Sequence, residues 1–424
     1  MKTVGIIAEY NPFHNGHAYQ IAEAKRITGA DYAVVVMSGD FVQRGTPAIW
    51  DKYTRTKAAL LGGADLVFEL PVVYATASAE YFAEGGVALL TALGVDAICF
   101  GSECGDIDVL MQIANILQKE SPEFKSALDA SLREGLSFPL ARANALSEHC
   151  KAHGIDLCLT DVLNAPNNLL GIEYCKALLS FNSRLRPVTV KRSGNAYHEL
   201  SVAEGTYSSA SALRALIEQH PAGSSKASYT KLLSALEAQV PADVFPVYKD
   251  VLQQLPAITA DDCSTLLSYR LLYETTDTLS KYSDWNPELG NRILSLDTTA
   301  SGFDQTAASL KSRQITLTRA NRMLLHVLLQ ITAEQLQTAR TGGSAFYARL
   351  LGLREASSKA LRLLCDRTSL PVINKLAPSL KELDGIASEL LMQDIRAAKL
   401  YLMLQQKKVQ ADLPNEFTRG VVRI

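Results

Sequence analysis

The sequence predicts an α/β protein, with a parallel β-sheet and its helices over residues 1–222 and a mainly α-helical domain over residues 223–424. Apolar runs rich in β-branched residues recur about every 30 residues near the start of the chain, with helical patterns between them, which is typical of βαβ units. Beyond residue 223, leucine and alanine recur at helical spacing. Loops at 10–17, 38–45 and 101–105 follow the expected strands. Because ligands collect at the carboxyl ends of parallel strands, these loops are the candidate site.

The first expected strand and helix meet at an Asn-Pro turn. Val4 to Ala8 is a short apolar run, and the proline that follows lacks an amide proton, so the strand ends there. A helical pattern then begins with His14 and His17, which share one face of its first turn. Backbone amides and the helix dipole favour phosphate at this position. Gly16 leaves room for a nucleotide, although two such histidines taken alone are more often surface or core residues.

The other expected elements follow in chain order. Strands are expected at 31–37, 65–70, 97–100 and 186–192, a short strand or buried turn at 156–160, and a loop at 194–205. Helices are expected from Thr46-Pro47 to about 61, at 78–93, over 106–153, from a cap at Asn167 or Asn168 to 179, and from 208. Later helical patterns cover 230–280, 318–339, 345–365 and 385–405.

Further polar groups are candidates for a nucleotide site, and each has a simpler explanation. Gly101 ends the fourth expected strand, where a bare backbone can accept an adenine or ribose edge or form an ordinary turn. Asn167 and Asn168 offer amide groups at a helix start, or one of them caps the helix. Arg192 follows a strand and is either a phosphate ligand or part of a solvated pair with Lys191.

Two serines and three arginines complete the candidates. Ser209 and Ser211 stand at a helix start, where their hydroxyls can bind phosphates or cap the helix. In the helical half, Arg313, Arg319 and Arg322 form a basic cluster that can follow RNA phosphates, or a solvated helix face. The net charge of −2 gives no overall basic signal, so any RNA contact must be local.

Composition excludes several classes of protein. The seven cysteines are scattered without a CxxC pair, so no metal site is predicted. No GxxxxGK[ST] or GxGxxG motif occurs, which disfavours P-loop and dinucleotide-binding sites. No apolar run approaches the roughly 18–20 residues that span a bilayer, and no secretory signal is recognised. A cytoplasmic protein without membrane contact is expected, and no protein partner is indicated.

Eight motifs together resemble one family. They are AEYNPFHNGH (8–17), MSGDFVQRG (37–45), GADLVFELP (63–71), FGSECG (100–105), PNNLLGIEY (166–174), VKRSGNAYHE (190–199), YSSASALR (207–214) and QDIRAAKLY (393–401). HxGH within the first is similar to the signature of the nucleotidyltransferase superfamily, whose fold is Rossmann-like. In their order, all eight resemble the bacterial tRNA(Met) cytidine acetate ligase family.

The resemblance implies a tRNA-modifying ligase that uses ATP to activate acetate as acetyl-adenylate and then acetylates N4 of the wobble cytidine of elongator tRNA(Met). The implied partners are ATP, acetate and the anticodon region of the tRNA, with Mg²⁺ expected beside the phosphates. His14 and His17 are implied to stabilise the charge that develops as pyrophosphate leaves. The implied ATP-binding residues are Ile7, Ala8, Glu9, Tyr10, Asn11, Pro12, Phe13, His14, Asn15, Gly16, His17, Ala18, Tyr19, Gln20, Gly101, Asn167, Asn168, Arg192, Ser209 and Ser211.

Two other functions stay open at this point. One is a nucleotidyltransferase that joins a nucleotide to a small phosphorylated metabolite, which the large basic helical half disfavours. The other is an RNA-binding protein whose nucleotide site is regulatory. For the ligase, the loops after the first two strands are expected to enclose acetate through Asn11, Ser38, Gly39 and Gln43, and Arg313, Arg319 and Arg322 are expected to contact tRNA.

Overall fold

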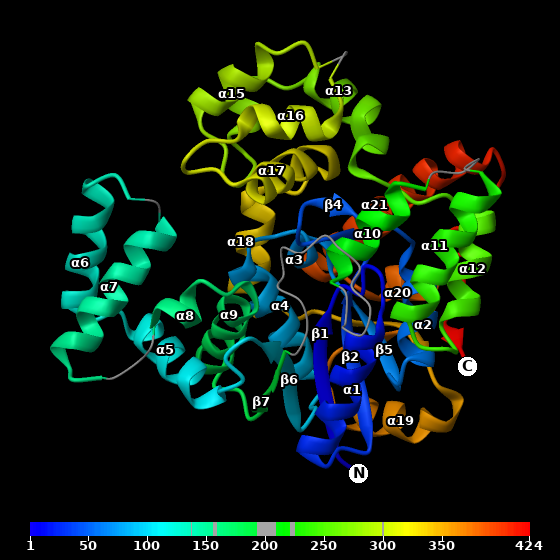
Figure 1. The fold of residues 1–424 in the computed structure, drawn as a ribbon, viewed down its shortest axis with the longest axis horizontal. Helices are drawn as coiled ribbons and strands as arrows, with labels where there is room; N and C mark the ends of the chain where they lie inside the picture. Colours follow the sequence, from blue (N-terminus) through cyan, green and yellow to red (C-terminus); the bar gives the residue numbers. More distant parts are fainter. Residues whose placement is uncertain (137, 156–158, 193–208, 221–224, 299–300) are drawn as a thin grey trace.

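The computed structural model describes residues 1–136, 138–155, 159–192, 209–220, 225–298 and 301–424 (Figure 1). The loop expected at 194–205 lies outside these residues, as does most of the strand or turn expected at 156–160. The described end of that stretch belongs to a helix that begins at Leu159.

One mixed sheet organises the fold. Its strand order is β10-β8-β5-β2-β1-β6-β7, with β9 paired to β8, and a separate two-stranded sheet joins β3 and β4. The bounds are β1 (Thr3–Ala8), β2 (Tyr32–Ser38), β3 (Phe41–Val42), β4 (Thr46–Pro47), β5 (Leu66–Leu70), β6 (Ala97–Ser102), β7 (Arg186–Lys191), β8 (Ala348–Leu353), β9 (Val372–Ile373) and β10 (Val422–Arg423). Strands β5, β2, β1, β6 and β7 are mutually parallel, which confirms the expected parallel sheet.

Helices cover both faces of the sheet (Figure 1). The helices of the first half are α1 (Asn15–Thr28), α2 (Lys52–Leu61), α3 (Val72–Ala75), α4 (Ala79–Ala92), α5 (Ile107–Lys119), α6 (Pro122–Arg133), α7 (Phe138–Ala152), α8 (Leu159–Leu163), α9 (Pro166–Ser180) and α10 (Ala210–Glu218). Successive residues of β2 point to opposite faces. Val34 and Val36 share an apolar cluster with Leu90 of α4, whereas Val35 shares a second cluster with Ile21 of α1.

The second half of the described chain is mainly helical, as the sequence predicts. Its helices are α11 (Lys226–Gln239), α12 (Phe245–Gln254), α13 (Ser264–Leu271), α14 (Thr276–Leu279), α15 (Pro287–Leu294), α16 (Phe303–Leu310), α17 (Leu317–Leu329), α18 (Ala333–Thr341), α19 (Ser358–Arg367), α20 (Leu376–Glu382) and α21 (Gly385–Val409). Figure 1 shows α13, α15 and α16 grouped at the top, and α11 and α12 side by side at the right.

The expectation of a helix at 345–365 is wrong for its first part. Residues Ala348–Leu353 form β8, which pairs antiparallel with β5 and parallel with β10, and all six residues are buried. A short apolar run fits a buried strand and a buried helix equally well, so periodicity cannot separate the two. The division at residue 222 remains a prediction, and the sheet takes β8, β9 and β10 from beyond it.

The expected helix start at Thr46-Pro47 is also wrong. These two residues form β4, which pairs with Phe41 and Val42. The helix begins at Lys52, because the Asp51 carboxylate caps it by accepting bonds from the amides of the next turn at 2.9 and 3.0 Å.

Arg55 of α2 holds the loops that follow the first two strands. Its side chain is fully buried, and its guanidinium donates to the carbonyl oxygens of Glu9 (2.6 Å), Ser38 (3.1 Å), Gly39 and Trp50 (2.9 Å). Each carbonyl lies where a strand has ended or a helix has not begun, and so needs a donor from elsewhere. One cation therefore fixes both loops at the carboxyl edge of the sheet.

A buried ionic network ties the same edge to the C-terminal segment. Lys52 lies 2.8 Å from a carboxylate oxygen of Glu69 in β5 and 2.8 Å from one of Glu416. Arg349 in β8 contacts the same two carboxylates, at 2.9 Å for Glu69. Burial alone would raise the pKa of Glu416, but the two cations hold it well below its usual value. The C-terminal segment is thus joined to the sheet by ion pairs that are shielded from solvent.

Replacing Arg55 tests the first of these arrangements. Arg55→Leu leaves four buried carbonyl oxygens without their donor, so we expect the free energy of unfolding to fall by about 3–5 kcal/mol. The measurement is urea denaturation followed by circular dichroism. Arg133→Leu on the exposed end of α6 is the control and should change stability by less than about 0.5 kcal/mol. Equal stability of the two variants would contradict the role given to Arg55.

Candidate active site

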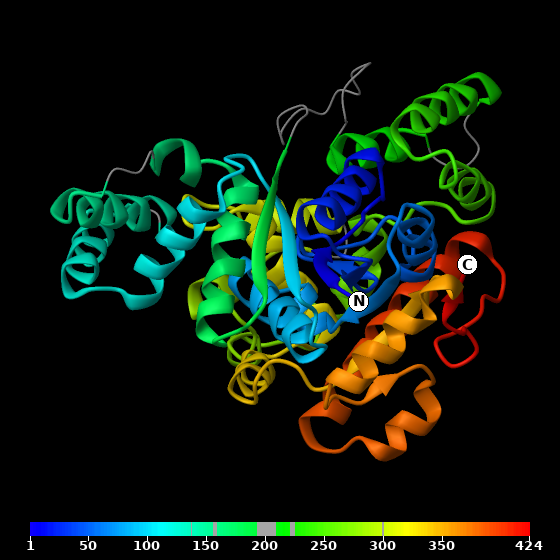
Figure 2. The same ribbon diagram turned by 90° about the horizontal axis from the view of Figure 1, so that it is seen from below.

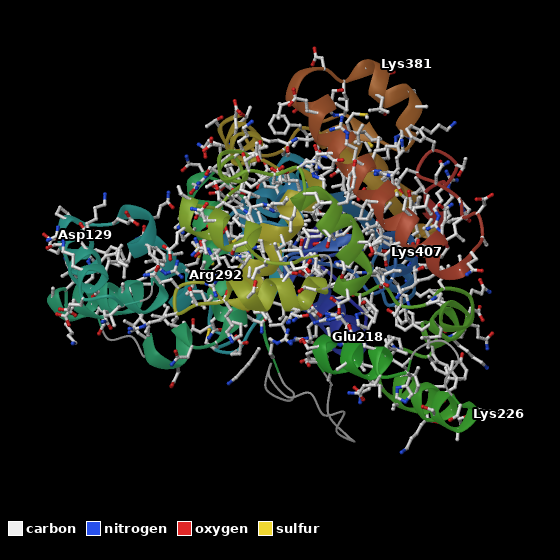
Figure 3. All side chains as sticks on the ribbon, turned by 90° about the horizontal axis from the view of Figure 1, so that it is seen from above. Asp129, Glu218, Lys226, Arg292, Lys381 and Lys407 are labelled. Atoms are coloured by element: carbon white, nitrogen blue, oxygen red, sulfur yellow. The ribbon has the colours of Figure 1, made fainter. Side chains whose placement is uncertain are left out.

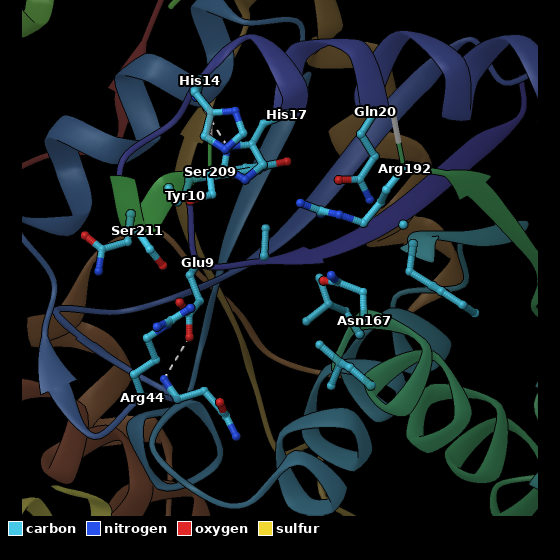
Figure 4. Close-up of a pocket in the computed structure, with 18 of the residues that line it drawn as sticks. Glu9, Tyr10, His14, His17, Gln20, Arg44, Asn167, Arg192, Ser209 and Ser211 are labelled. Carbon is cyan, nitrogen blue, oxygen red and sulfur yellow. Dashed lines mark hydrogen bonds between the residues drawn. The ribbon is translucent and has the colours of Figure 1, made fainter. Parts of the chain in front are cut away.

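A cavity of ≈ 210 Å³ lies where β1 and β6 end and α1 begins (Figure 4). It brings together most of the residues expected from the sequence. The lining residues are Ile7, Ala8, Glu9, Tyr10, Asn11, His14, His17, Gln20, Gln43, Arg44, Phe82, Phe100, Gly101, Asn167, Leu170, Tyr174, Arg192, Ser209, Ala210, Ser211 and Arg214.

The two histidines cap α1 reciprocally. Nδ1 of His14 accepts the amide of Gly16 at 3.0 Å, and Nδ1 of His17 accepts the amide of His14 at 3.3 Å. The rings stack with centroids 3.8 Å apart, as the shared helical face predicts. Since each Nδ1 is an acceptor, each neutral ring carries its proton on Nε2. The backbone amide of Gly16 is therefore occupied by His14, and each ring keeps its Nε2–H as a donor.

Both histidines are neutral in this environment. Burial lowers the pKa of His14, the charges of Arg192 and Arg214 act in the same direction, and together they bring it to about 3. Burial also lowers the pKa of His17 well below its usual value, with contributions from His14 and Arg192. The pair thus offers two uncharged N–H donors, and the positive charge of the cavity comes from arginines.

Arg214 links the helix α10 to the turn after β1. Its guanidinium donates to the Asn11 carbonyl at 2.6 Å and to the Ser211 hydroxyl at 3.0 Å. Ser209 caps α10 by accepting the amide of Ala212 at 3.1 Å, so the structural explanation of this serine holds, and it also lines the cavity. Arg44 and Arg192 line the cavity as well. Two of these guanidinium groups, those of Arg192 and Arg214, act on the pKa of His14, and Arg44 completes the cationic lining of the cavity.

Glu9 supplies the carboxylate among the lining residues. One of its oxygens accepts the amide of Gln43 at 2.9 Å, which joins the loop after β1 to the loop after β2 (Figure 4). Its backbone carbonyl is held by Arg55. A carboxylate fixed among cations lies beside the expected phosphate site.

The opposite wall of the cavity is apolar. Phe82, Phe100, Leu170 and Tyr174 line it, and the rings of Phe100 and Tyr174 are 5.3 Å apart. The sequence reasoning missed Phe82, Leu170 and Tyr174, because apolar positions on a helix read as core. It also missed Arg44, although the polar loop 38–45 was identified as part of the edge.

The two asparagines at the start of α9 have different positions. Asn167 lines the cavity, and its amide donates to a Glu103 oxygen at 2.6 Å. Asn168 is buried away from the cavity, where its side chain bonds the amides of Glu103 and Cys104 and the carbonyl of Val162. Neither asparagine is the expected cap. The helix follows Ala165, and the Glu103 carboxylate accepts the amides of Asn167 and Asn168.

The HxGH turn is held by the helical half of the chain. The buried Tyr248 hydroxyl of α12 accepts the amide of Phe13 at 2.8 Å and donates to the carbonyl of the same residue at 3.1 Å. Asn15 donates to the carbonyl of Ala238 in α11 at 3.2 Å. Nothing in the sequence indicated these contacts. Tyr10, at φ 48°, precedes a cis Asn11-Pro12 bond.

The expected site residues thus fall into two groups. Those that line the cavity are Ile7, Ala8, Glu9, Tyr10, Asn11, His14, His17, Gln20, Gly101, Asn167, Arg192, Ser209 and Ser211. Those that do not line it are Pro12, Phe13, Asn15, Gly16, Ala18, Tyr19 and Asn168. Of the residues expected around acetate, Asn11 and Gln43 line the cavity, whereas Ser38 and Gly39 lie beneath it with their carbonyls on Arg55.

The three arginines expected at the RNA surface do not share one exposed face. Arg313 is exposed, and Arg319 is paired with Asp284 at 2.6 Å. Arg322 packs against the loop after β2: its guanidinium is 3.5 Å from the Gln43 carbonyl, and a side chain on Gly45 would meet its backbone.

Two absences hold for the part of the chain that the structure describes. It contains no group of three or more His, Cys, Asp or Glu side chains arranged to hold a metal ion. Within the same residues, no helix has the length and apolar character needed to cross a membrane.

The fold and the paired histidines define a nucleotidyl transferase of the HIGH type. The model of the HIGH nucleotidyl transferase family matches residues 1–416. A tRNA(Met) cytidine acetate ligase from Acetivibrio thermocellus is 37% identical over 423 residues and is covered completely, as is this chain. One from Clostridium perfringens is 37% identical over 418 residues, covering 97% of this chain and 98% of its own.

Solved structures agree with these relatives. The crystal structure of Thermotoga maritima TmcAL in its apo form superposes with a TM-score of 0.90 at 30% identity, and the form bound with alpha-thio ATP with a TM-score of 0.88 at 30% identity, each over 100% of both chains. The chain belongs to the tRNA(Met) cytidine acetate ligase family, as its motifs predict.

The neutral state of His14 makes a testable contribution to stability. Its folded-state pKa of about 3 lies below the usual 6.5, so the unfolded chain binds a proton that the folded chain does not as pH falls below 6.5. Stability is therefore lost as pH falls. Between pH 6.5 and 4.5, His14→Asn should lose less stability than the wild type by on the order of 2 kcal/mol, since Asn can still cap the helix.

Urea denaturation at the two pH values measures this difference. His153→Asn, at an exposed position after α7, is the control and should keep the wild-type dependence. If His14→Asn shows the same loss between the two pH values as the wild type, His14 is not held neutral by the fold.

Proposed function

We propose that this protein uses ATP to activate acetate as acetyl-adenylate and transfers the acetyl group to N4 of the wobble cytidine of elongator tRNA(Met). The observation that carries the proposal is the histidine pair, whose two Nε2–H donors share one cavity with the side chains of three arginines. Membership of the ligase family supports the choice of acetate and tRNA(Met) as substrates. An enzyme that acts on tRNA with ATP is expected in the cytoplasm.

The first step is attack of an acetate oxygen on the α-phosphorus of ATP, with pyrophosphate as the leaving group. His14 and His17 donate to phosphate oxygens as charge develops, and the fixed backbone bonds at Nδ1 keep both donors in place. Arg192, Arg214 and Arg44 offset the charge of the pyrophosphate. Gly101 and Asn167, together with the apolar wall of the cavity, are the proposed surroundings of adenosine.

Mg²⁺ fits this cavity only as a companion of ATP. Mg²⁺ commonly binds through one or two carboxylates, waters and substrate phosphates. The described lining offers the carboxylate of Glu9, and one of its oxygens is already bonded to the Gln43 amide. When bound, the ion would neutralise the β- and γ-phosphates, and the residues of the chain would orient the α-phosphate.

In the second step the cytidine amine attacks the acetyl carbon of acetyl-adenylate. A C–N bond forms, the bond from the acetyl carbon to the phosphate oxygen breaks, and AMP leaves with the electron pair. The amine must then lose one proton. Glu9 is placed to accept it, because it is the carboxylate of the described lining and its other oxygen is not held by Gln43.

The tRNA-binding surface is proposed to include the loop after β2. Arg322 contacts that loop directly, and Arg319 and Arg313 precede it along the start of α17 and the segment before it. These three arginines are therefore proposed to bind phosphates of the tRNA near the loop after β2. Arg319 and Arg322 are partly buried, and Arg319 is also paired with Asp284. Arg313 is therefore the most accessible of the three.

Removing either histidine tests the first step. His14→Ala and His17→Ala should each lower acetate-dependent ATP–pyrophosphate exchange by at least about 10²-fold, since a preorganised donor to the developing charge is lost. Circular dichroism should show an intact fold. The matched control is His153→Ala, which should keep wild-type exchange. Near-wild-type exchange in both site variants would remove the proposed catalytic pair, and exchange that ignores acetate would instead favour a nucleotidyltransferase.

Glu9→Gln tests the second step separately. The amide keeps the bond from the Gln43 amide but is not a base, so transfer from preformed acetyl-adenylate to tRNA should fall by about 10²–10⁴-fold. Exchange should fall much less. If Glu9→Gln changes the Mg²⁺ concentration that exchange requires, and leaves transfer alone, Glu9 is a metal ligand rather than a proton acceptor.

A further inference from the structure

A second cavity, of ≈ 450 Å³, lies between the C-terminal segment and the start of α20. Figure 2 shows the red C-terminal segment beside the orange segment that contains α20. No motif of the sequence indicated this cavity, and the proposed chemistry does not use it. Six of its lining residues carry the argument: Tyr53, Arg349, Lys375, Phe417, Arg419 and Arg423.

The charge of this cavity is positive. Four cations line it against the single carboxylate of Glu416. Arg349 is matched by its buried ion pairs with Glu69 and Glu416, and Arg419 is paired with Asp51 at 2.9 Å. Lys375 and Arg423 are exposed, and neither side chain has an ion pair or hydrogen bond with another described residue. The cavity therefore has charge available for an anion.

Aromatic rings stand next to these cations. The Arg419 guanidinium lies 4.9 Å from the ring centroid of Tyr53, and Phe417 is 47% exposed. Cations combined with an exposed aromatic ring suit a ligand that has both a phosphate and a base. A cavity of this size is in the range that accepts ligands of nucleotide size.

One end of the cavity, at Arg349, lies at the same edge of the sheet as the candidate active site, and Arg423 lies toward the other end of β8, beside Leu353. Ala8, which lines the active-site cavity, is in register with Met37, Met37 with Glu69, and Glu69 with Arg349. Three strand spacings of about 4.8 Å put Ala8 and Arg349 about 14 Å apart. A single RNA molecule is therefore long enough to reach both cavities at once.

We propose that this cavity binds an unpaired, phosphate-bearing stretch of the same tRNA whose cytidine enters the active site. The inference rests on the proposed function for the identity of the RNA. Lys375 and Arg423 bind phosphate oxygens, and Phe417 stacks on a base. The buried ion pair of Arg349 with Glu416 fixes these two lining residues. Lys52 contacts both Glu416 and Asp40, and so joins the cavity to the loop after β2.

The double variant Lys375→Ala/Arg423→Ala tests this site in the full-length protein. Fluorescence anisotropy with elongator tRNA(Met) at several salt concentrations should show about 10-fold or more weaker binding, and the slope of log K against log salt should fall by about 0.7–0.9 for each lost phosphate contact. Phe417→Ala should weaken binding without changing the slope, since stacking releases no counterions. Acetate-dependent ATP–pyrophosphate exchange should stay at the wild-type rate.

The matched control removes two exposed arginines elsewhere, Arg133→Ala/Arg292→Ala. Arg292 lies on α15, well away from the C-terminal region marked by Lys381 and Lys407 in Figure 3. If the cavity variant and the control bind tRNA equally, the inference is overturned. It is also overturned if cytidine or adenosine monophosphate saturates the cavity without competing with tRNA, which would make it a site for a free nucleotide. If the wild-type protein shows no acetate-dependent ATP–pyrophosphate exchange, the proposed function itself is contradicted, whatever the cavity binds.

Discussion

The guanidinium of Arg55 is the contact on which the candidate site depends. It brings together the carbonyl groups that end β1 and β2 and the one that precedes α2, so a single side chain fixes the spacing of three loops. The turn that carries His14 and the loop that carries Gln43 and Arg44 both start from these carbonyls. No carboxylate is among these partners of Arg55. The carbonyl oxygens accept hydrogen bonds from its N–H groups and so satisfy the buried guanidinium. The position of the cavity follows from this arrangement.

The electrostatics of the cavity separate two tasks that the sequence suggested for the histidines. A cationic imidazole would offer charge as well as a hydrogen bond, but burial and the neighbouring arginines keep both rings neutral. In the proposed reaction the arginines therefore hold the phosphates, and the rings donate directed hydrogen bonds with a fixed tautomer. Such donors need no proton uptake before ATP binds. The arrangement suits a reaction in which charge moves between phosphate oxygens and little of it reaches the protein.

Much of the fold and the centre of the site could be predicted, because both depend on short-range patterns. Val4 to Ala8, the Asn-Pro turn and the histidine spacing are local signals, and they locate the cavity correctly. What could not be predicted depends on long-range contacts. Tyr248 meets the backbone of Phe13 from the other half of the chain, and β8 is a strand only because β5 and β10 flank it. Glu103 replaces the expected asparagine cap for the same reason: no local pattern shows that a loop 64 residues away will meet α9.

The use of late strands in an early sheet has a consequence for synthesis on the ribosome. After residues 1–222 have emerged, β5 still presents an open edge, since β8 lies at residues 348–353. The HxGH turn likewise lacks its hydrogen bonds to the Tyr248 hydroxyl until that residue has emerged. An exposed apolar strand edge invites pairing with another chain, and non-local pairing of this kind is slow. The nascent protein therefore passes through a long interval in which the edge of β5 is unpaired, and chaperones that shield strand edges would act on it during that interval.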